Sequence, residues 1–149
     1  ALEAKKCSRL RMNYNFHASP EDPIQRMIVV ICKGSYIRPH RHFIENKWEF
    51  VLALEGRLLL WLFDEVGKVV AKHEISNSNN IYGIEIPPIF YHTWMSVDET
   101  AVFFEFKAGP YSAQTTNQFA EWAPSEDSDQ VKSFQKKLET IRVGDFIKI

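Results

Sequence analysis

The sequence is poor in cysteine, in net charge and in long hydrophobic runs, and each shortage excludes a class of protein. Two cysteines among 149 residues, Cys7 and Cys32, are too few for a disulfide framework, so we expect a protein of the reducing cytoplasm. The net charge is −1 and no basic stripe occurs, which argues against a nucleic-acid partner. No apolar run approaches the roughly 18 residues that span a bilayer, so we expect no membrane partner.

The chain contains instead a series of short apolar stretches between turn-forming residues. Hydrophobic residues make up 45% of the chain and eleven residues are phenylalanine, enough for the core of one domain. The stretches recur roughly every eight to twelve residues without a long helical pattern between them, which is typical of an all-β sandwich or barrel. The expected strands cover residues 11–16, 25–32, 36–37, 48–54, 57–63, 69–75, 81–86, 91–97 and 101–106.

The pattern changes to that of a helix after residue 124. Val131, Phe134, Leu138 and Ile141 recur at helical spacing, with acidic residues before them and basic residues toward the end. We therefore divide the chain into an N-terminal extension (1–10), a β-barrel domain (11–124) and a C-terminal helix and tail (125–149). We assign no chemistry to the helix.

Two of the expected strands, residues 48–54 and 57–63, carry apolar side chains on both faces. A strand of this kind must be covered on both sides. We therefore predict a homodimer, with the C-terminal helix covering part of the remaining surface.

Two histidines one residue apart, His40 and His42, are the first indication of function. Alternate residues of a strand point to the same face, so both imidazoles project together. Glu49 lies in the next apolar stretch, on a face that also carries small side chains, and His92 follows a double-proline turn. Three imidazoles and one carboxylate suit one divalent transition metal (Fe, Mn, Ni, Co, Cu or Zn) and leave two positions of an octahedral ion open.

The spacing of these residues resembles the two motifs of the cupin superfamily. The first motif is Gly, five residues, His-x-His, three or four residues, Glu, six residues and Gly; the second is Pro-x-Gly-x-x-His with a later Asn. Ile89 and Ser96 replace the Gly and the Asn of the second motif, and Ile89 counts against the usual turn because β-branched residues tolerate positive φ poorly. The matching residues are Gly34, His40, His42, Glu49, Gly56, Pro87 and His92.

A second carboxylate competes with Glu49 for the fourth ligand position. Six residues separate His42 from Glu49, which is longer than the motif, whereas Glu45 follows His42 by three. We favour Glu49 because it lies inside a clear strand pattern and keeps the motif's distance to Gly56. Glu45 remains the alternative.

Longer pieces of the sequence resemble the WbuC-type cupin-fold metalloproteins, which occur in bacterial polysaccharide (O-antigen) gene clusters and whose reaction is not established. The resemblance covers about residues 5–124. It implies a cupin double-stranded β-helix, or jelly-roll barrel, a divalent metal at the four expected ligands, a homodimer, and a role in bacterial surface polysaccharide metabolism. The matching pieces are Arg11-Met-Asn-Tyr-Asn-Phe-His17, Gln25-Arg-Met27, Gly34-Ser-Tyr-Ile-Arg-Pro-His-Arg-His42, Lys47-Trp-Glu49, Leu54-Glu-Gly-Arg57, Glu85-Ile-Pro-Pro88, Phe104-Glu-Phe-Lys-Ala-Gly-Pro-Tyr111 and Phe119-Ala-Glu-Trp-Ala-Pro124.

Several polar residues are candidates for substrate binding. Arg38 has the parity of His40, so its guanidinium either clamps a carboxylate or phosphate, or forms a salt bridge at the barrel mouth. Arg11, Asn13, Asn15 and His17 form a polar row that alternates along one face. They bind a sugar, close the pocket of a partner chain, or form the solvated face of an outer strand.

Three further residues have both a functional and a structural interpretation. Glu105 is the one charged residue in an apolar strand, and it is either a catalytic acid or base or the ion-pair partner of Lys107 or Arg57. Tyr36 and Trp94 either line a ligand cavity or belong to the core. Trp94 is the stronger candidate for the cavity, because it has the same strand parity as His92, the last of the expected ligands.

The ligand set is compatible with more than one function. The first is a metal-dependent enzyme that isomerises, epimerises, cleaves or oxygenates a small polar or anionic molecule, such as a sugar or sugar nucleotide. The second is a non-catalytic module that binds or senses a small molecule. The third, a metal-free epimerase with a His base and a Tyr acid, is disfavoured by the carboxylate beside the His-x-His pair.

Overall fold

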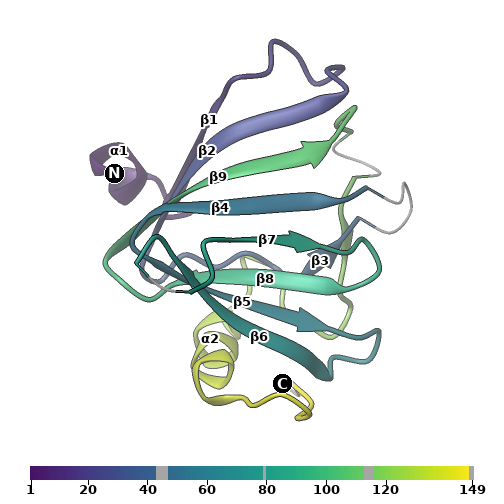
Figure 1. Cartoon of the computed structure of the whole chain (residues 1–149). Coiled ribbons are helices and arrows are strands. Elements are labelled where there is room, and N and C mark those ends of the chain that lie inside the picture. Colours follow the sequence, from purple (N-terminus) through teal and green to yellow (C-terminus); the bar gives the residue numbers. More distant parts are fainter. Residues whose placement is uncertain (43–46, 79, 113–115, 148–149) are drawn as a thin grey trace.

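The computed structural model describes residues 1–149 except 43–46, 79, 113–115 and 148–149, and its described strands form two five-stranded antiparallel sheets (Figure 1). The first sheet has the order β1 (Arg11–Asn15), β2 (Ile24–Cys32), β9 (Thr100–Ala108), β4 (Glu49–Glu55) and β7 (Gly83–Ile86). The second has the order β10 (Gln118–Phe119), β3 (His40–Arg41), β8 (Tyr91–Ser96), β5 (Arg57–Phe63) and β6 (Val69–Ser76). The predicted all-β architecture is confirmed.

The main core lies between the two sheets. Val51 of β4 and Phe103 of β9 reach it from the first sheet, and Leu58, Leu60 and Ile75 reach it from the second. All five are buried, and each strand contributes alternate residues because successive side chains point to opposite faces. The alternation therefore fixes which side chains face the space between the sheets.

The C-terminal helix α2 (Val131–Thr140) covers the outer face of the second sheet (Figure 1). Phe134 and Leu138 of α2 are fully buried against Trp61 and Phe63 of β5. Strand β5 is thus covered on both faces, as its apolar residues at consecutive positions predict. A shorter helix, α1 (Leu2–Lys6), precedes the barrel and contacts β1 and β2. No helix among the described residues is long and apolar enough to cross a membrane.

Two glycines of the first motif adopt the backbone conformation that favours glycine. Gly34 has φ of +86° and Gly56 has φ of +72°. A Cβ at Gly56 would also lie only 2.7 Å from the carbonyl oxygen of Thr100, so a side chain is excluded between β4 and β5. Ile89 has no positive φ, and the turn before β8 therefore forms without the glycine of the second motif.

The structure and the sequence-based expectations differ in the shortest elements. Residues 36–37 are not a strand; they belong to an irregular segment that leads to β3, in which Pro39 lacks the N–H of a ladder residue. The two-residue strand β10 and the five-residue helix α1 were not expected. Neither is long enough to produce a periodic pattern of hydrophobic residues.

Candidate metal centre

Four side chains that are distant in the sequence meet between the sheets: His40, His42, Glu49 and His92, called the tetrad below. Each offers one ligand atom, and these atoms all lie within 4.8 Å of one another. His40 of β3 pairs with His92 of β8 in the second sheet, whereas Glu49 is the first residue of β4 in the first sheet. The tetrad therefore spans both sheets, and it brings together the four residues expected as metal ligands, with His42 lying just after β3.

Hydrogen bonds orient two of the imidazoles. Nδ1 of His40 lies 3.0 Å from the carbonyl oxygen of Arg38, and Nδ1 of His42 lies 2.8 Å from that of Thr116. A carbonyl oxygen can only accept, so each Nδ1 carries a proton and donates it. The Nε2 atoms are thereby left as the atoms that could bind an ion.

Glu49 joins the other members of the tetrad. Its Oε2 lies 2.8 Å from Nε2 of His42 and 3.8 Å from Nε2 of His92. All three side chains are at most 3% exposed. Nε2 of His92 has no hydrogen-bond partner among the described residues, although it is buried. A buried nitrogen without a partner costs free energy, which an ion bound at this position would recover.

Burial and the neighbouring charges set the protonation states. Burial lowers the pKa of His92 to about 4 and, together with the other two imidazoles, holds the pKa of His40 well below its usual value. Burial alone would raise the pKa of Glu49, but the hydrogen bond from His42 and the nearby imidazoles outweigh it and lower the pKa. Near neutral pH, therefore, Glu49 is ionised and His40 and His92 are neutral, the forms in which these groups bind a metal.

The pKa of His42 is shifted in the opposite direction. Burial would lower it, but the hydrogen bond and charge of Glu49 raise it above the ordinary value. A metal ion would take the place of this proton between the two side chains. Three neutral nitrogens and one carboxylate oxygen then form a donor set that fits a divalent transition metal.

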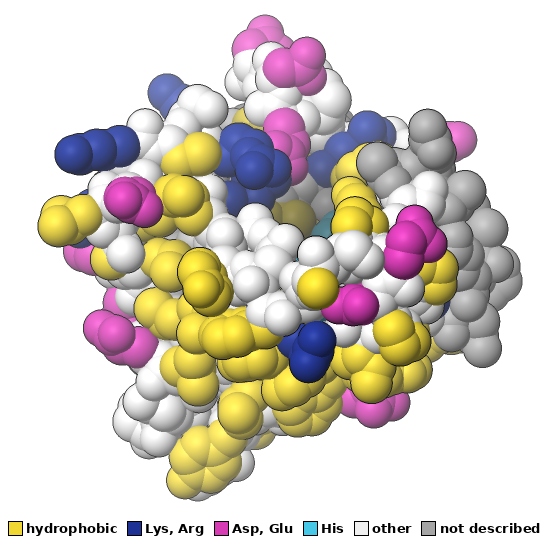
Figure 2. Space-filling view, turned by 90° about the horizontal axis from the view of Figure 1, so that it is seen from above, with side chains coloured by type: hydrophobic (Ala, Val, Ile, Leu, Met, Phe, Trp, Pro, Cys, Tyr) yellow, Lys and Arg dark blue, Asp and Glu magenta, His cyan; other side chains and the backbone are white. Residues whose placement is uncertain are grey.

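His40 and Glu49 form part of the wall of a cavity of about 670 Å³, within the size range of small-molecule sites. Figure 2 looks into a hollow in which a histidine is visible, with basic and acidic side chains at its rim. Five of the residues expected to bind or act on a substrate also line this cavity: Asn13, Asn15, His17, Trp94 and Glu105. The polar row on β1 therefore faces the cavity.

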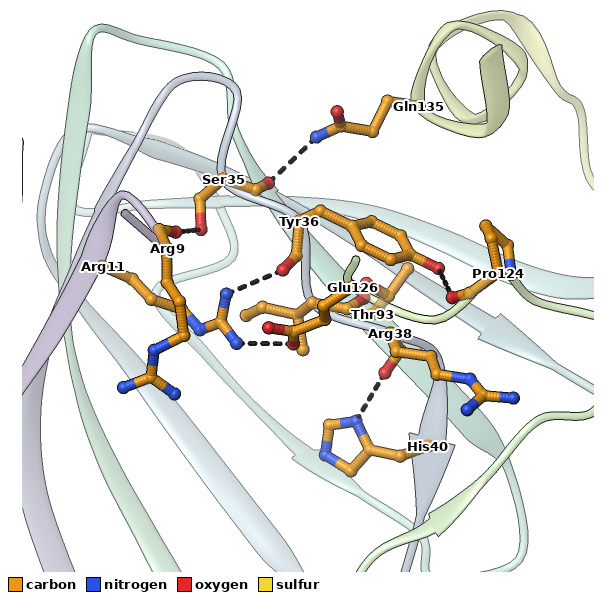
Figure 3. A network of polar contacts seen from close by, with 11 residues as sticks. Arg9, Arg11, Ser35, Tyr36, Arg38, His40, Thr93, Pro124, Glu126 and Gln135 are labelled. Carbon is orange, nitrogen blue, oxygen red and sulfur yellow. Dashed lines mark hydrogen bonds and ion pairs between the residues drawn. The ribbon is translucent and has the colours of Figure 1, made fainter. Parts of the chain in front are cut away.

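The structure places Arg38 and Tyr36 elsewhere, and neither is among the residues that line the cavity. Arg38 donates a hydrogen bond to the carbonyl oxygen of Ala120 (2.8 Å), and its side chain extends away from the ring of His40 (Figure 3). The hydroxyl of Tyr36 donates to the carbonyl oxygen of Pro124 (2.8 Å). Glu45, the alternative ligand, lies outside the described residues.

Glu105 lines the cavity and pairs with Lys107 at 2.8 Å. The ion pair is one of its two expected roles, and the role of catalytic acid or base stays a prediction. Burial raises the pKa of Glu105, and the charge of Glu49 adds to this. Burial would lower the pKa of Lys107, but Glu105 and Glu49 outweigh it and raise the pKa. Lys107 is directly opposite Glu49 on the neighbouring strand, so a permanent positive charge lies beside the tetrad.

Lys107 is a candidate site residue that the sequence analysis considered only as a partner of Glu105. Its position two residues after Glu105 places it on the same face of β9. Strand parity could therefore have identified Lys107. A single lysine near the end of a strand is ordinarily exposed, however, so by itself it is weak evidence for a functional site. Two arginines also line the cavity. Arg11 was recognised only as a member of the polar row of β1, and Arg9 was missed because it lies before the strand, where no alternating pattern includes it.

The family model described as "Domain of unknown function (DUF6016)" matches residues 1–75. No curated protein matches the sequence. The WbuC-type resemblance of the sequence accordingly stays a prediction at the level of the family.

Solved structures resemble the barrel at low sequence identity. The capsular polysaccharide assembling protein CapF from Staphylococcus aureus has a TM-score of 0.61 at 15% identity, over 74% of this chain and 32% of CapF. The Cupin_2 domain of an XRE family transcriptional regulator from Enterobacter cloacae has a TM-score of 0.51 at 11% identity, over 68% of this chain and 98% of that one. An HTH_3 family transcriptional regulator from Vibrio cholerae has a TM-score of 0.50 at 17% identity, over 68% of this chain and 52% of the regulator.

This chain therefore spans about a third of CapF and about half of the Vibrio cholerae regulator. At these identities the likeness concerns the fold alone. It confirms the expected cupin fold, an all-β jelly-roll barrel followed by a C-terminal helix.

Proposed function

Because this chain belongs to the DUF6016 family, whose function is unknown, and has the cupin fold, we propose that it is a divalent-metal-binding cupin that acts on a small polar or anionic molecule. The tetrad is the single observation that carries this proposal. Its four side chains supply one carboxylate and three imidazoles within 4.8 Å, and they adjoin a cavity large enough for a small molecule.

We propose that the tetrad binds one divalent transition metal per chain. Such an ion would polarise a bound oxygen or lower the pKa of a bound water. The protein's own residues would do the rest: Lys107 places a positive charge near the ligand, Glu105 is a candidate acid or base, and Trp94 and Phe103 supply apolar surface.

The metal content of protein purified without added metal tests this proposal. We expect about one equivalent of a divalent transition metal per chain by elemental analysis. Protein that contains no metal, and that takes up none when it is dialysed against Fe, Mn, Ni, Co, Cu and Zn salts, would contradict the proposal.

Two functions remain compatible with such a site. The first is an enzyme, an isomerase or epimerase, lyase or oxygenase, and the raised pKa of Glu105 beside the tetrad favours it. The second is a non-catalytic binding or sensing cupin, which is supported by the likeness to domains of two transcriptional regulators. Turnover of a candidate substrate that is lost on chelation and restored by metal would identify the enzyme.

We further propose a sugar-related ligand in bacterial surface polysaccharide metabolism. The WbuC-type resemblance supports this, and so does the fold shared with CapF, which is described as a capsular polysaccharide assembling protein. Two free cysteines, Cys7 and Cys32, agree with the cytoplasmic location expected from the sequence. The division into an extension (1–10), a barrel (11–124) and a C-terminal tail (125–149) belongs to the same proposal.

We also propose that the chain is a homodimer, because the outer face of the first sheet carries a row of aromatic rings. Phe16 stacks on Phe104 at 5.4 Å, Phe104 contacts Phe106 at 4.3 Å, and Phe106 contacts Phe50 at 6.3 Å between ring centroids. Tyr14 extends the row and is 69% exposed. Hydrophobic side chains also gather on one side of the molecule in Figure 2. An apolar surface of this kind marks an interaction site.

Light scattering tests the dimer. We expect a mass of twice 17.4 kDa at micromolar concentration, and a shift to the monomer in Phe16→Glu, because a charge buried in the interface is costly. Phe146→Glu is the matched control, since Phe146 is as exposed (51% against 50%) but lies outside this sheet. A monomeric wild type, or an equal effect of the two substitutions, would count against the interface.

A further inference from the structure

Two arginines lie at the cavity that adjoins the tetrad. Arg9 precedes β1 and Arg11 is its first residue, and both line the cavity. Arg11 donates through Nη1 to the carbonyl oxygen of Tyr36 (2.7 Å) and through Nη2 to Oε1 of Glu126 (2.6 Å). Figure 3 shows the Arg9 and Arg11 guanidinium groups and the Glu126 carboxylate on one side of the segment that carries His40.

The bond to Tyr36 holds Arg11 in place independently of Glu126. Tyr36 is itself fixed, because its hydroxyl bonds to the carbonyl oxygen of Pro124 and its ring packs against Phe134 of α2 at 5.9 Å. The Arg11 side chain is only 14% exposed. The other terminal nitrogen is therefore held by the fold where the Glu126 carboxylate now lies, so Arg11 would need little reorganisation to receive a different anion.

Glu126 is held much less firmly than the arginine with which it pairs. Its side chain is 38% exposed, and it lies between β10 and α2, outside any helix or strand. A partly exposed ion pair contributes little to stability. The Glu126 carboxylate can thus leave Arg11 by rotation of its own side chain, without disturbing a strand.

The other charged side chains of the cavity wall already have partners. Glu49 belongs to the tetrad, and Glu105 pairs with Lys107. Arg9, Arg11 and Glu126 remain, so the mouth of the cavity carries two cations and one carboxylate. When Glu126 turns outward, the mouth presents an excess of positive charge.

We propose that Arg9 and Arg11 form an anion subsite at the mouth of the cavity, which the Glu126 carboxylate occupies in this structure. The subsite takes the carboxylate or phosphate of a small ligand whose other end reaches the tetrad. This inference rests on the proposed function, in which the cavity receives a small molecule, and it specifies an anionic one. Glu126 acts as a built-in competitor, because a neutral molecule has no charge with which to replace it on Arg11.

Isothermal titration of the metal-free protein with inorganic phosphate, and separately with succinate, tests the subsite. Removing the metal makes the result independent of whether the tetrad binds an ion, because neither probe can then bind through the metal. Glu126→Gln keeps the size of the side chain and removes its charge. We expect it to bind phosphate, succinate or both about fivefold more tightly than the wild type, which is the size of effect that loss of a partly exposed ion pair allows.

Glu99→Gln is the matched control. It removes the same charge from a side chain that is 82% exposed and does not line the cavity. We expect it to change either affinity by less than about twofold, since screening weakens distant charges. Arg9→Gln should weaken binding about fivefold, and Arg11→Gln should abolish it; thermal unfolding shows whether each variant is folded.

Equal affinities of the wild type and Glu126→Gln for both anions, or an equal gain in Glu99→Gln, would overturn the proposal. A higher affinity for phosphate than for succinate, or the reverse, shows whether the subsite prefers a phosphate or a carboxylate. The metal content of the same preparations before chelation is measured separately. A failure of the proposed metal function is thereby distinguished from a failure of the subsite.

Discussion

His92→Ala is expected to bind its divalent metal more than about 100-fold more weakly than the wild type, and to be purified with little or none. Loss of a residue that merely supports a ligand already lowers metal affinity about 10- to 100-fold, and His92 would be a ligand itself. Its Nε2 is buried, lies 3.8 Å from Oε2 of Glu49 and has no hydrogen-bond partner among the described residues. Elemental analysis after dialysis, with titration of a divalent metal into the metal-free variant, measures the loss.

His73→Ala is the control for this substitution, because His73 is the one histidine on β6 and is neither in the tetrad nor at the cavity wall. It should keep the metal content of the wild type. Glu49→Gln separates the two possible carboxylates, since it removes the charge with little change in size. If Glu49→Gln retains full metal content, Glu45 becomes the better candidate, and if His92→Ala also retains it, the assignment of the site is wrong.

Phe134→Ala is expected to lower the free energy of unfolding by about 3–5 kcal/mol, the usual cost of removing a buried phenylalanine. Phe134 is fully buried between α2 and the outer face of the second sheet, where its ring contacts Tyr36 at 5.9 Å and Trp122 at 6.5 Å. Its removal leaves a cavity under the helix that Tyr36 and Trp122 cannot easily fill. Urea unfolding monitored by circular dichroism measures the change.

Phe146→Ala is the matched control, because the same atoms are removed from a ring that is 51% exposed. Its effect should be about 1 kcal/mol or less. Equal unfolding midpoints for Phe134→Ala and the wild type would mean that α2 is not part of the cooperative unit. Since Tyr36 links Phe134 to Arg11, the same variant is also expected to disturb the mouth of the cavity.

Much of the fold can be predicted from sequence because the long strands carry complete patterns. The pattern of β5 indicates both of its buried faces, and turn residues such as Gly56 mark where strands end. The tetrad follows from parity and spacing, as its histidines and Glu49 all lie on or beside strands. An alternating pattern of this kind needs only a few residues, so it is sufficient to predict a strand and its buried face where the strand is long.

The remaining features depend on contacts that no local pattern reveals. Arg11 and Glu126 are 115 residues apart, and they meet because the segment between β10 and α2 passes beside Tyr36, to which Arg11 also bonds. Tyr36 is of a residue type that often lines cavities, but its hydroxyl donates instead to the carbonyl oxygen of Pro124, in the segment between β10 and α2. Arg38 is similarly fixed by Ala120. In each case the decisive partner comes from a segment whose position the sequence alone does not give.

The distribution of the tetrad over two sheets has a consequence for the mechanics of the barrel. Three of its side chains come from or adjoin strands of the second sheet, and Glu49 comes from the first. An ion bound by all four side chains would cross-link the two sheets, which otherwise contact each other through the hydrophobic core. Metal binding and the packing of the two sheets are then thermodynamically linked. A change that separates the sheets would lower the affinity for the metal, and the bound metal would stabilise the barrel against unfolding.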